Sequence, residues 1–81
     1  MVETRRARRF RVAKAALIEQ RGDKLQCIIR DISLTGASLE VSQASGVPET
    51  FNLVLPEDGL DLRCHVVWRR GFRLGVIFEE P

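Results

Sequence analysis

The sequence is poor in the residue types on which catalysis and metal binding depend. Its 81 residues include one histidine, two cysteines and no tyrosine. Cys27, Cys64 and His65 cannot alone supply the four ligands of an ordinary structural zinc site. The sequence shows no nucleophile–base–orienter set, since Asp31 and Ser33 lack a histidine with which to form a triad, and no glycine-rich phosphate loop is present. We therefore expect no enzyme, no metal site and no cofactor.

Long apolar runs are also missing. No stretch approaches the roughly 20 residues that a membrane-spanning helix needs. The apolar segment 12–18 follows a basic start but is interrupted by Lys14, and no small-residue cleavage site follows it. We expect a cytoplasmic protein without a membrane partner.

In a reducing cytosol, Cys27 and Cys64 should be buried free thiols rather than a disulfide.

Positive charge is concentrated at one end of the chain. Residues 1–14 contain six Lys or Arg and one Glu, a local net charge of +5. Residues 15–81 contain seven basic and ten acidic side chains, a net charge of −3. This asymmetry favours a localised anion site over a broad nucleic-acid-binding face.

Alternation of apolar and polar residues predicts a small all-β domain. A chain of this length forms a single domain. The predicted strands are 12–20, 25–32, 37–41, 51–55, 60–69 and 72–78. Turns are expected at 21–24, 42–49, 56–59 and 70–71, where Gly, Pro and Asp gather. Six short strands joined in this way fit a closed antiparallel barrel, which has no exposed edges.

Residues 1–11 are expected to form a flexible basic arm ahead of the barrel. Five arginines crowd this segment, which has few apolar residues. A basic amphipathic helix is an alternative, because Ala7, Phe10 and Leu17 recur at helical spacing. The mutual repulsion of the arginines and the thin apolar stripe favour the arm.

A polar corner, Asp31-Ile32-Ser33-Leu34-Thr35-Gly36, separates the second and third predicted strands. Asp31 and Ser33 can bond nearby backbone amides or point toward a ligand. Gly36 allows a positive φ that a branched residue would adopt only at a cost. Considered alone, the corner is better explained as an ordinary Asx or Ser/Thr turn than as a binding site.

The arm and the corner together resemble the signature of the PilZ domain. Arg5 and Arg9 are spaced R-x-x-x-R, and D-x-S-x-x-G follows about twenty residues later at Asp31, Ser33 and Gly36. The tail 66–78 is similar to the last hairpin of that family. The resemblance implies a six-stranded antiparallel β-barrel of PilZ type over residues 12–81, with residues 1–11 as a flexible basic N-terminal arm.

The resemblance also implies a bacterial receptor or adaptor for the second messenger cyclic di-GMP. Arginine can pair with phosphate oxygens or with guanine O6 and N7, and a carboxylate can accept from guanine N1–H and N2–H₂. The implied ligand-binding residues are Arg5, Arg6, Arg9, Asp31, Ser33 and Gly36. The arm would become ordered over the ligand and signal to a downstream protein partner or attached domain.

Two other functions stay open on the sequence. One is a PilZ-like adaptor that binds a protein and no nucleotide. The other is a small barrel whose basic arm binds RNA.

Trp68 has two interpretations. It shares the parity of Leu62, Cys64 and Val66, which predicts that it packs in the core. It could instead lie at the barrel mouth and stack on a base.

Overall fold

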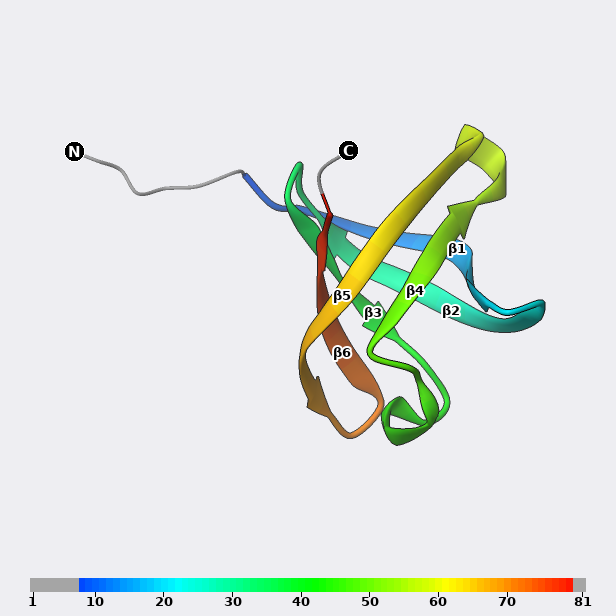
Figure 1. The fold of residues 1–81 in the computed structure, drawn as a ribbon. Coiled ribbons are helices and arrows are strands. Elements are labelled where there is room, and N and C mark those ends of the chain that lie inside the picture. Colours follow the sequence, from blue (N-terminus) through cyan, green and yellow to red (C-terminus); the bar gives the residue numbers. More distant parts are fainter. Residues whose placement is uncertain (1–7, 80–81) are drawn as a thin grey trace.

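Six antiparallel strands close into a barrel in the order β1-β2-β3-β6-β5-β4 (Figure 1). The computed structural model describes residues 8–79. The strands are β1 (Phe10–Gln20), β2 (Asp23–Ile32), β3 (Gly36–Glu40), β4 (Thr50–Leu55), β5 (Leu60–Arg70) and β6 (Arg73–Phe78). Single 3₁₀ turns, η1 (Ala44–Gly46) and η2 (Pro56–Asp58), precede and follow β4. The predicted fold class is confirmed.

Short turns set the register of the hairpins. Arg21 and Gly22 join β1 to β2, and both have positive φ, 53° and 87°. Two successive positive φ angles give the turn whose twist matches that of the flanking strands. Gly71 (φ 58°) performs the same function between β5 and β6, and Gly59 (φ 65°) ends η2.

The barrel interior is apolar and closely packed. Its largest fully buried side chains are Ile29, Leu39, Phe51, Leu53, Cys64 and Leu74. They come from five strands, so the core depends on closure of the whole sheet. Cys27 is also buried, and burial raises the pKa of the Cys27 and Cys64 thiols to about 12. The predicted burial of both cysteines is confirmed.

The loop between β3 and β4 is fastened to β5 by one side chain. Arg69 Nη1 donates to the carbonyl oxygens of Ala44 and Val47, both at 2.6 Å. Ala44 and Val47 also bury their side chains. Two charge-assisted hydrogen bonds from one guanidinium group therefore hold η1 against β5.

The first strand begins two residues earlier than predicted, at Phe10. Phe10 and Arg11, assigned to the arm from the sequence, pair with Ile32 and Asp31 of β2. The helical alternative is wrong for the part of it that lies in β1, because Phe10–Gln20 is extended. Within residues 8–79, no helix has the length and apolarity needed to span a membrane.

Candidate functional site

The pairing of neighbouring strands is irregular at three places in the barrel. The register of β1 with β2 shifts between Arg11 and Lys14, and that of β2 with β3 shifts between Ile29 and Asp31. The register of β5 with β6 shifts between Val66 and Trp68. In β2 and in β5, the extra residue reverses the in–out alternation beyond it. In these two strands, side chains that continue the core parity in sequence are thereby turned to the outer surface.

Asp31 is the clearest example. Its parity matches that of Cys27 and Ile29, which face the core. Because Arg30 is the extra residue opposite β3, Asp31 instead pairs with Ser38. The outward turn places a carboxylate on the surface, where a ligand can reach it.

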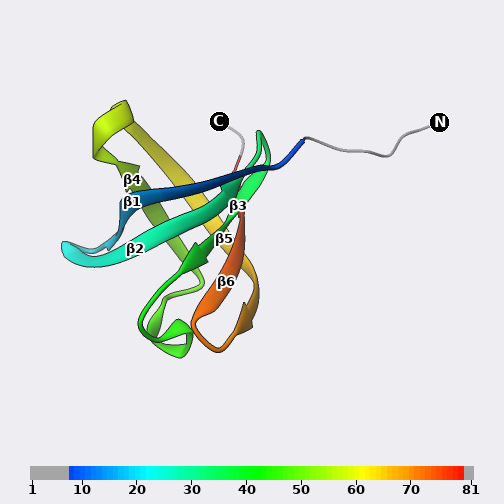
Figure 2. The same cartoon turned by 180° about the vertical axis from the view of Figure 1, so that it is seen from behind.

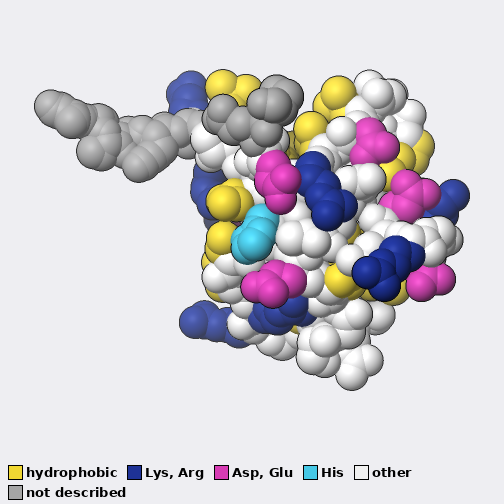
Figure 3. All heavy atoms as spheres, viewed as in Figure 1, with side chains coloured by type: hydrophobic (Ala, Val, Ile, Leu, Met, Phe, Trp, Pro, Cys, Tyr) yellow, Lys and Arg dark blue, Asp and Glu magenta, His cyan; other side chains and the backbone are white. Residues whose placement is uncertain are grey.

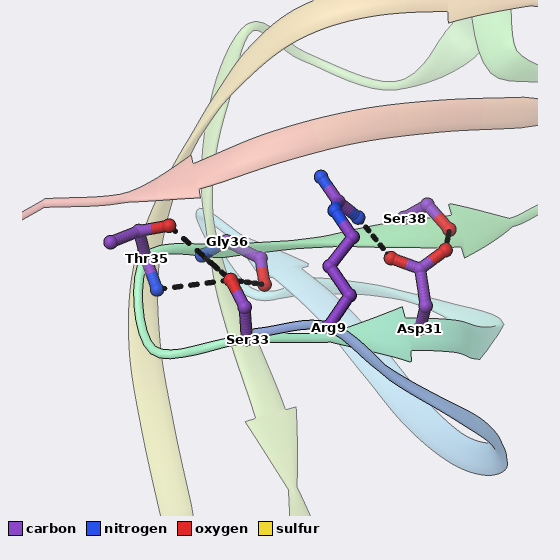
Figure 4. Close-up of polar contacts among 6 residues, drawn as sticks. All are labelled: Arg9, Asp31, Ser33, Thr35, Gly36 and Ser38. Carbon is purple, nitrogen blue, oxygen red and sulfur yellow. Dashed lines mark hydrogen bonds and ion pairs between the residues drawn. The ribbon is translucent and has the colours of Figure 1, made fainter. Parts of the chain in front are cut away.

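The Asp31 carboxylate is held from both sides (Figure 4). Arg9 Nη1 donates to Oδ1 and forms an ion pair with it. Ser38 Oγ donates to Oδ2 at 2.6 Å, and Ser38 is only 4% exposed. A charged acceptor with a buried donor beneath it has a fixed orientation. Sequence analysis missed this role of Ser38, because only the cross-strand register reveals it.

Asp31 belongs to a row of residues that crosses the outer face of five strands. Successive cross-strand partners in this row are Arg11, Asp31, Ser38, Gly75 and Trp68. Adjacent strands lie about 4.8 Å apart, so the row extends over roughly 19 Å. It starts with a cation and a carboxylate and ends with an indole. Arg11, which was left outside the predicted site, lies opposite Asp31.

Ser33 lies in the turn between β2 and β3, apart from the Asp31 group (Figure 4). Its hydroxyl accepts from the backbone N–H groups of Thr35 and Gly36, both at 3.2 Å, and lies 3.3 Å from the Gly36 carbonyl. Its own N–H donates to that carbonyl at 2.8 Å. The hydroxyl is therefore fully used within the turn, and a direct bond from Ser33 to a ligand stays a prediction.

Gly36 is needed for a reason other than the one expected. Its φ is not positive, so the predicted backbone conformation is wrong. A Cβ at this position would lie 2.2 Å from the Val76 carbonyl oxygen of β6. Gly36 therefore permits the close approach of β3 and β6, next to the Phe78 N–H bond to the Thr35 carbonyl.

Trp68 lies on the surface, so the predicted core position is wrong. It is 44% exposed. The extra residue Val67 opposite β6 turns the indole outward over Gly75. A Cβ on Gly75 would lie 2.1 Å from Trp68 Nε1. The indole thus fills the place of the missing side chain at position 75.

A polar hollow of about 460 Å³ adjoins Asp31. Arg11, Arg30 and Arg73 line it, one each from β1, β2 and β6. Arg30 lies 3.6 Å from Glu40 in an exposed ion pair. Because Arg9 already neutralises Asp31, and Glu40 pairs with Arg30, the guanidinium groups of Arg11 and Arg73 leave an excess of positive charge that is suited to an anionic ligand.

On the face in Figure 3, over β4 and β5, acidic and basic side chains of the described residues are interspersed. Arg5 and Arg6, two predicted ligand residues, lie outside the described residues. Within residues 8–79, no three His, Cys, Asp or Glu side chains come together in a way that could hold a metal ion.

Comparison with known proteins agrees with this geometry. No curated protein matches the chain. The sequence model of the PilZ domain matches residues 3–81, which is nearly the whole length. On this match and on the closed six-stranded barrel, the chain belongs to the PilZ domain family.

Proposed function

We propose that this domain binds cyclic di-GMP on the outer face of the barrel, across the row from Arg11 to Trp68. PilZ domains generally bind cyclic di-GMP and act as binding or adaptor domains rather than enzymes. The observation that carries the proposal for this chain is the Asp31 carboxylate. A bulge turns it outward, and the side chains of Arg9 and Ser38 fix it.

Each part of the row suits one part of the ligand. Asp31 can accept hydrogen bonds from guanine N1–H and N2–H₂. Arg9 and Arg11 can each make bidentate bonds to a phosphate, or to guanine O6 and N7. The exposed Trp68 indole offers a stacking surface for a base. Arg30 and Arg73 supply further positive charge for the second phosphate.

The Arg9–Asp31 pair gives binding a defined first step. In the ligand-free protein, Arg9 occupies the carboxylate that a guanine would use. Guanine replaces the guanidinium on Asp31, and Arg9 transfers to a phosphate or to the other edge of the base. No guanidinium group is left without a partner in this exchange, because each arginine keeps an anionic or dipolar acceptor.

The arm is the second part of this mechanism. Arg5 and Arg6 would approach the phosphates from residues that precede β1. Ordering backbone that is free costs about 1–2 kcal/mol per residue, which the contacts to the ligand would offset. The ordered arm would then present a new surface to a downstream partner.

Direct titration tests the proposal. Calorimetry with cyclic di-GMP, GTP and an RNA oligomer should give saturable binding of cyclic di-GMP alone, with unfavourable entropy and an affinity that falls with salt. Binding of RNA as tight as that of cyclic di-GMP would favour an RNA-binding arm.

A nucleotide-free adaptor is the second candidate. It is favoured by one observation, namely that each oxygen of the Asp31 carboxylate already accepts a hydrogen bond from a side chain of this domain, Arg9 or Ser38. The absence of any binding in the same titration would support this adaptor and reject the cyclic di-GMP site.

A further inference from the structure

Ser38 carries a buried hydroxyl on the outer side of the barrel. Among residues 8–79, it is the only residue with a polar or charged side chain that is buried. Its neighbours on β3, Ala37 and Leu39, belong to the core, so Ser38 itself points outward. It lies two residues beyond the family motif, which ends at Gly36. The motif therefore does not account for this hydroxyl, and its role has to follow from the group to which it bonds.

That group is the Asp31 carboxylate (Figure 4). Ser38 Oγ donates to Asp31 Oδ2 at 2.6 Å, a separation typical of hydroxyl groups that donate to a charged oxygen. The Asp31 side chain is 22% exposed, whereas Ser38 is covered. A ligand can therefore reach the carboxylate, but it can contact Ser38 hardly at all. Any effect of Ser38 on a ligand has to pass through Asp31.

The backbone of Ser38 is held on both sides. β3 lies between β2 and β6 (Figure 2), and Ser38 pairs with Asp31 on one side and with Gly75 on the other. Arg9, the second donor to the carboxylate, precedes β1, and its side chain is 59% exposed. A ligand can therefore displace Arg9 from Oδ1, while Ser38 keeps its bond to Oδ2.

This difference between the two donors matters for base recognition. Each carboxylate oxygen has two lone pairs, so Oδ2 can keep its bond to Ser38 and still accept from a base. Guanine presents N1–H and N2–H₂ side by side, and both reach the carboxylate only if its plane is aligned with the base. Adenine has an acceptor at N1 beside its single donor group, so it gains nothing from the alignment. A fixed carboxylate therefore favours guanine.

We propose that Ser38 is a positioning residue that sets the preference of this site for guanine over adenine, because its bond to Oδ2 aims the Asp31 carboxylate at the base. The inference rests on the proposed binding of cyclic di-GMP. It assigns to Ser38 no contact with the ligand.

Calorimetric titration of the full chain with cyclic di-GMP and cyclic di-AMP tests the proposal. Ser38→Ala removes the hydroxyl, and Ser38→Cys keeps nearly the same volume with a weak donor. Both variants should bind cyclic di-GMP about tenfold more weakly, while the affinity for cyclic di-AMP changes less than about twofold. Ser45→Ala, at an exposed serine of η1, is the matched control and should leave both affinities unchanged.

The outcomes separate this role from others. Equal weakening of the two dinucleotides, or a loss in Ser38→Ala that Ser38→Cys does not share, would assign Ser38 to packing and overturn the proposal. An unchanged preference for guanine in both variants would also overturn it and leave the proposed function standing. Failure of the wild type to bind cyclic di-GMP would reject the proposed function together with this role. Should Ser38→Ala fail to fold, Ser38→Cys provides the same comparison.

A double-mutant cycle shows whether Ser38 acts through Asp31. In the Asp31→Ala background, Ser38→Ala should change the affinity for cyclic di-GMP by less than about twofold, because the group that it orients is gone. A further tenfold loss would show that Ser38 acts independently of Asp31 and would overturn the proposal. The cycle uses cyclic di-GMP alone, so it decides the question even where cyclic di-AMP binds too weakly to measure.

Discussion

Trp68 and Gly75 form a matched pair across β5 and β6, in which the indole occupies the space of the side chain that Gly75 lacks. A Cβ on Gly75 would lie 2.1 Å from Nε1 and 2.4 Å from Cε2 of Trp68. The two residues oppose each other because Val67 is the extra residue in β5. The pair fixes an aromatic surface at one end of the row that begins with Arg11 and Asp31.

Gly75→Ala should displace the Trp68 indole and weaken the binding of cyclic di-GMP. Loss of one base stack costs about 1–3 kcal/mol of binding, a decrease of roughly fivefold to 150-fold. Stability should fall by no more than about 1 kcal/mol, because the half-exposed Trp68 can move away. Emission of the single tryptophan and calorimetric titration measure both effects. Gly46→Ala, which has open space around its Cβ, is the matched control.

Asp31→Ala separates base recognition from attraction of charge. If the site only attracted phosphates, removal of an anion would tighten binding. A carboxylate that reads guanine predicts weaker cyclic di-GMP binding and a smaller preference over cyclic di-AMP, whose adenines lack the N1–H and N2–H₂ donors. Titration of wild type and variant with both dinucleotides decides the question. Equal wild-type affinity for the two would rule out base recognition by Asp31.

Arg9→Ala and Arg11→Ala should each cost about 1.5–3 kcal/mol of cyclic di-GMP binding, since each removes charge-assisted bonds. The salt dependence of the affinity should also become less steep. Arg63→Ala is the control, because Arg63 lies on β5 and bonds to Asn52 and Thr50, away from the row. An arginine whose variant binds like wild type has no place in the site.

Gly36→Ala should lower stability rather than recognition. The new Cβ would lie 2.2 Å from a backbone carbonyl oxygen of β6, so the two strands must separate. Strain of this kind costs about 1–3 kcal/mol of the free energy of unfolding. Chemical denaturation compared with Gly46→Ala measures it. An unchanged midpoint would show that the turn adapts and that Gly36 has another purpose.

The two buried thiols predict a specific response to pH. Burial raises the pKa of Cys27 and Cys64 from 9.0 to about 12, so the folded protein holds protons that the unfolded chain releases. Their contribution to stability is complete below pH 9 and is lost as the pH rises toward 12. Denaturation across this range should show the decline, and it should be smaller in Cys27→Ala. Folded protein at pH 8 should resist a thiol-specific reagent until denaturant is added, and rapid labelling would contradict this.

The sequence was sufficient for the fold class and for most of the core. Alternation with period 2 marks the inner residues Leu39, Leu53 and Leu74 directly, because one face of each strand excludes water. Gly22 and Gly71 mark turns whose φ angles few other residues adopt. The family signature also named Arg9 and Asp31, which the fold brings into contact.

Only the tertiary structure decided which way the site residues face. Asp31 and Trp68 both continue a core parity in the sequence, yet both are turned outward by an extra residue, Arg30 or Val67. A bulge is a relation between two strands, and neither strand alone records how many residues its neighbour has opposite it. For the same reason, the sequence could not reveal that Ser38 supports Asp31, that Arg11 stands opposite it, or that Gly75 makes room for Trp68. Local alternation determines what is apolar, whereas the cross-strand register determines where each side chain points.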